Sequence, residues 1–283
     1  MPTIMTLGNL VCGFAAIHYA SKPVSQTGFH GWSTLTVAAT LVFVGMFFDA
    51  IDGFVARLTR SASEFGAQLD SMADMVTFGV APAFMMLRLV SHYFGTTDAA
   101  IFSPDAQSAY AKATWGVAGL YICCTALRLA RFNAETVSLE LEGHRSFRGL
   151  PSPGAAGVVV SLIILHQHLV AQSTGGLPDS MERFSSLAIP AGVLAAGLLM
   201  VSRLRYPHVV NRYLRGRKDF ATVAKIVLPI PLCIWYLQES LAVAFLLYAL
   251  SGPLFHFWSS DRRRAVTIAA SAPVDGGAQD ASR

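Results

Sequence analysis

The sequence predicts an all-α integral membrane protein, built as a bundle of about eight transmembrane helices. Of its 283 residues, 53% are hydrophobic and only 13% are charged, whereas about a quarter of the residues in a soluble domain are charged. The apolar residues also gather into runs that approach the roughly 20 residues needed to cross a bilayer. Because lipid offers the backbone no hydrogen-bonding partners, these runs are expected to be helices.

Eight runs along the chain are expected to span the membrane. In order, they cover residues 4–20, 32–58, 64–90, 110–132, 154–170, 185–200, 221–237 and 241–258. Residues 1–260 would then form one transmembrane domain. Residues 261–283 are expected to be a disordered cytoplasmic tail, because Ala, Ser, Gly and Asp dominate it after Arg264. The start of the chain lacks the basic region of a cleavable signal peptide.

The positive charges predict the orientation of the bundle. The net charge is +4, and Lys and Arg concentrate in four places, namely 57–60, 145–148, 203–218 and 262–264. With eight spans, all four fall on one side of the membrane, which the positive-inside rule makes the cytoplasmic side. The basic excess is therefore assigned to membrane topology in a cell membrane, and no nucleic-acid partner is expected.

The four cysteines support neither a disulfide framework nor a zinc site. Cys12, Cys123, Cys124 and Cys233 all lie inside apolar runs, with no CxxC or Cys/His spacing among them.

One segment, Asp49 to Asp74, places four carboxylates beside the lipid-spanning runs. Its pattern is Asp49-x2-Asp52-Gly53-x2-Ala56-Arg57-x8-Gly66-x3-Asp70-x3-Asp74. At about 100° per residue, the first two carboxylates share a helix face, and the last two form a stripe on the next helix. A short polar turn would bring both faces together, and four carboxylates could then stay ionised only beside a cation.

The donor atoms in this segment favour a hard metal ion. All four are carboxylate groups, with no His or Cys among them, which suits Mg²⁺, Mn²⁺ or Ca²⁺. Gly53, Ala56 and Gly66 would leave room for a ligand, while Arg57 and Ser63 could bind a phosphate. The alternative is that the carboxylates are helix-end charges paired with arginines of the turn.

The spacing resembles the signature of the CDP-alcohol phosphotransferase family at every defined position. Members are integral membrane enzymes that transfer a phosphatidyl group from a CDP-activated donor to an alcohol and release CMP. The resemblance implies a metal site formed by Asp49, Asp52, Asp70 and Asp74, holding two Mg²⁺ or Mn²⁺ ions, with Asp74 as the general base. It implies CDP-diacylglycerol binding by the residues around that site, which are Asn9, Gly53, Ala56, Arg57, Ser63 and Gly66. From the residues alone, Asn9 could equally be a helix cap or a packing residue.

Three further segments bear on which alcohol accepts the phosphatidyl group. SMADMVTFGVAPA, RLARFN and FRGLPSPGAAG are similar to segments of the phosphatidylserine synthases of this family, so the resemblance implies L-serine as acceptor. Arg128 and Arg131, three residues apart on one helix face, would bind its carboxylate or the donor phosphate. They could instead be positive-inside anchors or ion-pair partners of the Asp cluster. Because members are commonly dimers, the resemblance also implies a homodimer among membrane lipids.

Two rival functions remain open at this point. One is transfer to another alcohol: glycerol 3-phosphate, inositol phosphate or choline. The other is a cation transporter that uses the four Asp as its ion path. A transporter is expected to carry its acidic residues near the bilayer midplane on broken helices, whereas these lie at one membrane face. A purely structural membrane protein would leave the Asp pattern unexplained.

Overall fold

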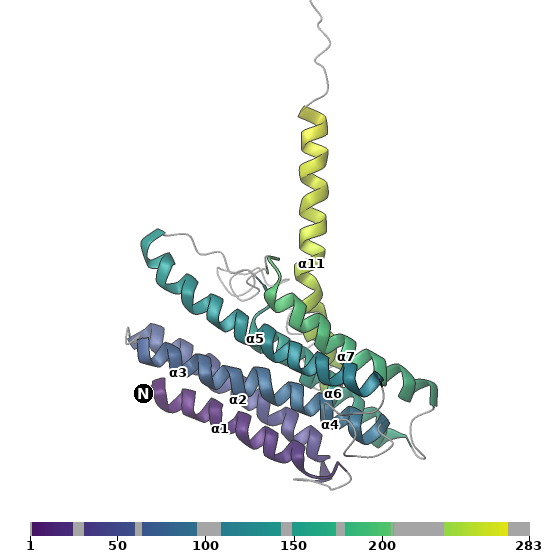
Figure 1. The fold of residues 1–283 in the computed structure, drawn as a ribbon. Helices are drawn as coiled ribbons and strands as arrows, with labels where there is room; N and C mark the ends of the chain where they lie inside the picture. The colour runs from purple at the N-terminus through teal and green to yellow at the C-terminus, as the bar shows by residue number, and fades with distance from the viewer. Residues whose placement is uncertain are drawn as a thin grey trace, which may run out of the picture.

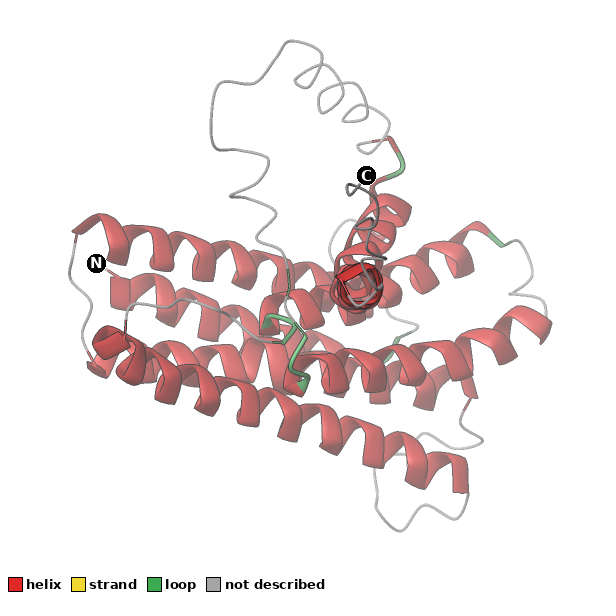
Figure 2. Ribbon diagram, turned by 90° about the horizontal axis from the view of Figure 1, so that it is seen from above, coloured by secondary structure: helices red, strands yellow, loops and turns green. Residues whose placement is uncertain are grey.

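The computed structural model is a bundle of long helices (Figures 1 and 2). It describes residues 2–24, 31–59, 64–94, 109–142, 149–173, 179–204, 206 and 235–270, and it contains no β-strand within these ranges. The helices are α1 (Pro2–Ser21), α2 (Thr34–Thr59), α3 (Glu64–Asp74), the π-helix η2 (Met75–Val80), α4 (Ala81–Phe94), α5 (Ala109–Glu142), α6 (Ser152–Gln172), α7 (Asp179–Val201) and α11 (Leu237–Ala270). The predicted all-α class is confirmed.

Six helical segments are long and apolar enough to cross a membrane. They are Thr3–Ser21, Thr34–Val55, Glu64–Tyr93, Ala109–Ala134, Ser152–Gln172 and Leu237–Leu254. In α7 the apolar part, Leu187–Val201, is shorter than these. The expected span at 221–237 lies almost entirely outside the described residues. The predicted count of eight is therefore not confirmed.

Two helices are longer than the sequence predicts. α5 continues to Glu142, beyond the expected end at residue 132, and α11 continues to Ala270, past the expected domain boundary at 260. Each extension begins with or contains polar and charged residues, so a prediction based on the length of an apolar run ends before the helix does. In Figure 1 the far part of α11 projects away from the other helices.

Helix α6 lies at the centre of the packing. It contacts α2, α4, α7 and α11, and its residues from Gly154 to Ser161 are buried. Small residues permit this, because a Cβ atom at Gly157 would overlap the ring of Phe245, and one at Gly154 would lie 2.9 Å from Tyr248. The two glycines therefore let α11 pack directly against the α6 backbone.

The residues before α6 are tied to the end of α7. The Gly149 backbone N–H donates to the Leu204 carbonyl at 2.8 Å, and the Leu150 N–H donates to the Leu199 carbonyl at 3.0 Å. Gly149 has φ +89°, a conformation that side-chain-bearing residues rarely adopt. Pro151 then precedes the first turn of α6, so the start of α6 and the end of α7 lie at the same end of the bundle.

Polar contacts also fix the opposite end of the bundle. Arg88 of α4 donates to the carbonyls of Ala20 and Lys22, at 3.0 and 3.1 Å. There, His168 near the end of α6 lies 3.3 Å from Glu239 in the first turn of α11. Since α11 also meets Gly154 near the start of α6, α11 and α6 run antiparallel.

Candidate active site and metal centre

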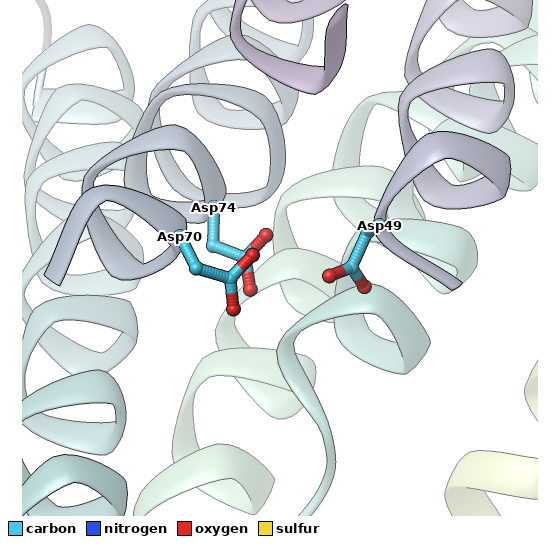
Figure 3. Close-up of side chains that lie close together, drawn as sticks. All are labelled: Asp49, Asp70 and Asp74. Atoms are coloured by element: carbon cyan, nitrogen blue, oxygen red, sulfur yellow. The ribbon is translucent and has the colours of Figure 1, made fainter. Parts of the chain in front are cut away.

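Three aspartates from two helices converge at one end of the bundle. Asp49 lies near the end of α2, while Asp70 and Asp74 lie one turn apart on α3. One carboxylate oxygen from each lies within 4.8 Å of the others. Figure 3 shows the Asp49 carboxylate facing the other two across the gap between the helices. The antiparallel arrangement of α2 and α3, expected from the short connection between them, is what brings these residues together.

The composition of this carboxylate group fits a divalent cation. All of its donors are oxygens, which are the ligands that hard cations prefer. Within the part of the chain that the structure describes, no Lys or Arg forms an ion pair with Asp49, Asp70 or Asp74. Three carboxylates at this distance repel one another unless positive charge is supplied. A bound divalent ion would supply it.

Asp52 does not belong to this group, although the sequence places it with the other three. It follows Asp49 by three residues, so its side chain is rotated by about 60° around the helix. The Thr6 hydroxyl of α1 donates to its Oδ2. Asp52 is buried, and its Oδ1 accepts no hydrogen bond from the described residues. Such an orphaned oxygen beside an acidic group is suited to receive a metal ion or a bound ligand.

Asn9 of α1 contacts Asp74 directly. Its side-chain Nδ2 donates to Asp74 Oδ1 at 3.0 Å, and both residues are buried. The bond fixes one oxygen of the carboxylate, while Oδ2 accepts no hydrogen bond from the residues that the structure describes. The expected contact between Asn9 and the nucleotide stays a prediction.

The other expected donor-site residues are described only in part. Gly53 on α2 and Gly66 on α3 are half-buried, on the helix segments that carry the carboxylates. Ala56 and Arg57 lie in the last part of α2, but their side chains lie outside the described set. Ser63 also falls outside the described residues. Their assignment to the CDP-diacylglycerol site stays a prediction.

The two arginines of α5 have different partners. Arg128 donates through Nη1 to the Ser152 hydroxyl in the first turn of α6, and its charge acts on Asp74 and Asp49. Arg131 donates to the Val201 carbonyl at the end of α7, at 3.4 Å. Arg128 therefore lies close enough to the acidic group for its charge to matter there, whereas Arg131 stabilises a helix C-terminus in this structure.

Sequence reasoning missed three contributors to this site. Thr6 holds Asp52, Ser152 holds Arg128, and Ser71 on α3 accepts a 2.9 Å hydrogen bond from Asn133 on α5. One signal was available, because Thr6 and Asn9 are three residues apart in an otherwise apolar span and so share a face. The partners of Ser152 and Ser71 lie on other helices, 24 and 62 residues away along the chain, and leave no such local signal.

The fold and the site together define a polytopic helical membrane protein with an acidic centre at one end. The family model for CDP-alcohol phosphatidyltransferases matches residues 1–201. The chain belongs to this family, so the resemblance drawn from the Asp spacing is confirmed.

Several relatives are named as enzymes that make serine phospholipids or their archaeal counterpart. The chain is 32% identical over 209 residues to the CDP-diacylglycerol–serine O-phosphatidyltransferase of Helicobacter pylori strain 26695, covering 73% of this chain and 71% of the relative. It is 29% identical over 208 residues to the enzyme of the same name from Bacillus subtilis, covering 74% and 90%. It is also 31% identical over 211 residues to the archaetidylserine synthase of Methanothermobacter thermautotrophicus, covering 74% and 70%.

Proposed function

We propose that this protein transfers the phosphatidyl group of CDP-diacylglycerol to the hydroxyl of L-serine, giving phosphatidylserine and CMP. The observation that carries the proposal is the convergence of Asp49, Asp70 and Asp74 within 4.8 Å, in a membrane protein of this family. The names of the relatives support serine as the acceptor and CDP-diacylglycerol as the donor.

The acidic group is the proposed metal site. Asp49, Asp70 and Asp74 would hold Mg²⁺ or Mn²⁺, with two ions in the complete site. Asp52 is kept in the proposed site because its Oδ1 is buried and accepts no hydrogen bond from the described residues. When bound, the metal would neutralise charge on the donor pyrophosphate, which is the main requirement of phosphoryl transfer.

Asp74 is the proposed general base. A base must reach the acceptor hydroxyl within hydrogen-bond distance or through one water. The buried amide of Asn9 restrains Asp74 Oδ1 at 3.0 Å, so Oδ2 is left to take the proton from serine. The serine oxygen then attacks the phosphorus that bears the lipid, and the bond from this phosphorus to the CMP oxygen breaks.

The remaining residues would bind the substrates. Arg128 is the proposed contact for the serine carboxylate or the donor phosphate, because it is half-buried and its charge acts on the acidic group. Arg131 is a weaker choice, since its guanidinium already contacts the Val201 carbonyl. The donor would lie against the small residues Gly53, Ala56 and Gly66, with Asn9, Arg57 and Ser63 around its nucleotide and phosphates.

The acidic end of the bundle is proposed to face the cytoplasm, in a cell membrane. The start of α1, the end of α7 and the start of α6 lie at this end, and the nearby segments of sequence carry most of the Lys and Arg. The positive-inside rule then sets the orientation. A homodimer is also proposed, on family resemblance alone, and cross-linking in membranes would test it.

The test is CMP release by the purified full chain in detergent, supplied with CDP-diacylglycerol and L-serine. Release is expected to need both serine and Mn²⁺ or Mg²⁺, to stop when EDTA is added, and to return with excess metal. Glycerol 3-phosphate, inositol phosphate and choline are the comparison acceptors. Metal-dependent release that prefers one of these would overturn serine as acceptor and retain phosphatidyl transfer. Folded protein that releases no CMP with any alcohol would overturn the enzyme itself.

A further inference from the structure

The helix that carries Asp70 and Asp74 changes its winding directly after Asp74. Residues Met75–Val80 form a π-helix, in which the Ala81 N–H bonds to the Val76 carbonyl five residues earlier. Short π-helical turns are rare and occur frequently at functional sites. Here the turn lies between the carboxylate and the rest of the span, so it determines how Asp74 faces its neighbours.

The sequence explains why the winding changes here. Pro82 has no N–H, and its ring would collide with the carbonyl four residues earlier, which belongs to Phe78. In the structure, the Tyr121 hydroxyl of α5 donates to this carbonyl at 3.0 Å. Tyr121 is fully buried. The displaced carbonyl therefore has a donor from a neighbouring helix, which stabilises the wider turn.

Thr77 lies inside the π-helix and bonds to α1. It is fully buried, and its hydroxyl donates at 2.9 Å to the backbone carbonyl of Asn9. The amide of the same Asn9 donates to Asp74 at 3.0 Å. Asn9 therefore makes two hydrogen bonds to the span that contains Asp74 and Thr77. Its backbone carbonyl accepts from Thr77, and its side-chain amide donates to Asp74.

Two glycines make room for this contact. A Cβ atom at Gly13 of α1 would overlap the Thr77 hydroxyl, and one at Gly45 of α2 would lie 2.7 Å from Thr77 Cγ2 and 2.9 Å from Asn9 Oδ1. Three helices therefore meet at Thr77 without a side chain between them. Such close packing leaves little freedom for α1 to slide past the helix that bears Asp74.

We infer that Thr77 is a positioning residue for the reaction: its hydroxyl fixes Asn9, and through Asn9 the carboxylate of Asp74. Tyr121 supports it by stabilising the π-turn. The inference rests on the proposed role of Asp74 as the base. A displacement of about 1 Å in a catalytic group can cost roughly 100-fold in rate, so loss of this one hydroxyl is expected to affect turnover more than substrate binding.

The test compares Thr77→Val, which keeps the shape of the side chain and removes the donor, with Thr77→Ser, which keeps the donor. We expect Thr77→Val to lower kcat roughly 10- to 100-fold, with KM for serine and for CDP-diacylglycerol within about twofold, and Thr77→Ser to recover most of the loss. Thr114→Val is the matched control, because the Thr114 hydroxyl is buried and, among the described residues, bonds to the Tyr110 carbonyl of its own helix alone, at 2.9 Å. Its kcat should equal that of the unchanged chain.

Several outcomes would overturn the inference. A Thr77→Val enzyme with unchanged kcat per folded molecule would do so, as would equal losses in Thr77→Val and Thr114→Val, or no recovery in Thr77→Ser. If Thr77→Val does not fold, Tyr121→Phe replaces it, since this change removes only the donor to the Phe78 carbonyl, and unchanged kcat there counts against the inference. Asp74→Asn is assayed in parallel: normal turnover in that variant would overturn the proposed base as well, whereas an inactive Asp74→Asn beside a normal Thr77→Val overturns the positioning role alone.

Discussion

At the scale of single residues, Asp74 differs from Asp49 and Asp70 in having a side-chain hydrogen-bond partner among the described residues. Asn9 holds one of its oxygens, and the residue is buried. If Asp74 takes the serine proton, Asp74→Asn removes the acceptor while preserving the size of the side chain. We expect turnover to fall by at least roughly 100-fold, towards the detection limit, while binding of CDP-diacylglycerol stays measurable. CMP release and donor binding, measured on the same preparation, check this.

A matched carboxylate at the other end of the molecule serves as the control for Asp74→Asn. Glu239 on α11 lies 3.3 Å from His168, which is near the end of α6. The acidic group lies beside the start of α6, so Glu239 is far from it. Glu239→Gln makes the same chemical change and should leave turnover intact. Wild-type turnover in Asp74→Asn would remove Asp74 from the role of base.

A second prediction at the scale of single residues concerns the hydroxyl of Thr6 and the stability of the protein. Its hydroxyl donates to the buried Asp52 carboxylate, whose other oxygen has no donor among the described residues. Thr6→Val removes that donor at constant shape, and leaving a buried acceptor unsatisfied costs about 1–3 kcal/mol. The thermal unfolding midpoint of the metal-free protein should fall, and Thr6→Ser should restore it. Thr40→Val, whose hydroxyl bonds within its own helix at 2.9 Å, should change the midpoint less.

At the scale of elements, contact between α6 and α11 depends on glycine. A methyl group at Gly157 would overlap the Phe245 ring, so Gly157→Ala forces the two helices apart or moves the ring. Overpacking of this kind costs about 1–3 kcal/mol, and the unfolding midpoint should drop. Gly116→Ala on α5 meets nothing within 4 Å and is the control, with an unchanged or slightly raised midpoint because alanine favours helix. Equal midpoints for both variants would show that α11 does not pack on α6 in this way.

Six of the expected spans and the meeting of Asp49 with Asp70 and Asp74 could be predicted from the sequence. Apolar length and the i,i+4 spacing of Asp70 and Asp74 are local signals, and the short link from α2 to α3 sets their meeting with Asp49. The orientation of the Asp52 side chain could not be predicted from the sequence, because it depends on where α1 packs against α2 and so places Thr6 beside Asp52. One feature of the sequence, Pro82 inside a span, indicates a disturbed helix at the position of the π-helix. The hydroxyl that stabilises it could not be predicted, because Tyr121 lies 43 residues along the chain from Phe78, whose carbonyl it binds. Contacts between distant segments therefore account for most of what was missed.

At the scale of the whole molecule, the structure gives the bundle two chemically different ends. The acidic group lies at one end, with the start of α1, the end of α2 and the start of α3. The other end carries Arg88, bonded to two carbonyls at the C-terminal end of α1, and the His168–Glu239 pair at the start of α11. The proposed acceptor is a soluble amino acid and the proposed product a soluble nucleotide, so the proposed reaction predicts a cytoplasmic position for the acidic end.

Cysteine labelling tests this orientation. In a background with the four native cysteines replaced, Glu64→Cys marks the acidic end, at the exposed start of α3, and Trp235→Cys marks the opposite end, where 83% of the tryptophan is exposed. In intact cells, a membrane-impermeant maleimide should label Trp235→Cys alone, and Glu64→Cys should react only after lysis. CMP release by each variant confirms that the labelled protein is folded. The reverse pattern would place the acidic group outside the cell, away from its proposed substrates, and would overturn both the orientation and the assignment of the basic segments to the cytoplasmic face.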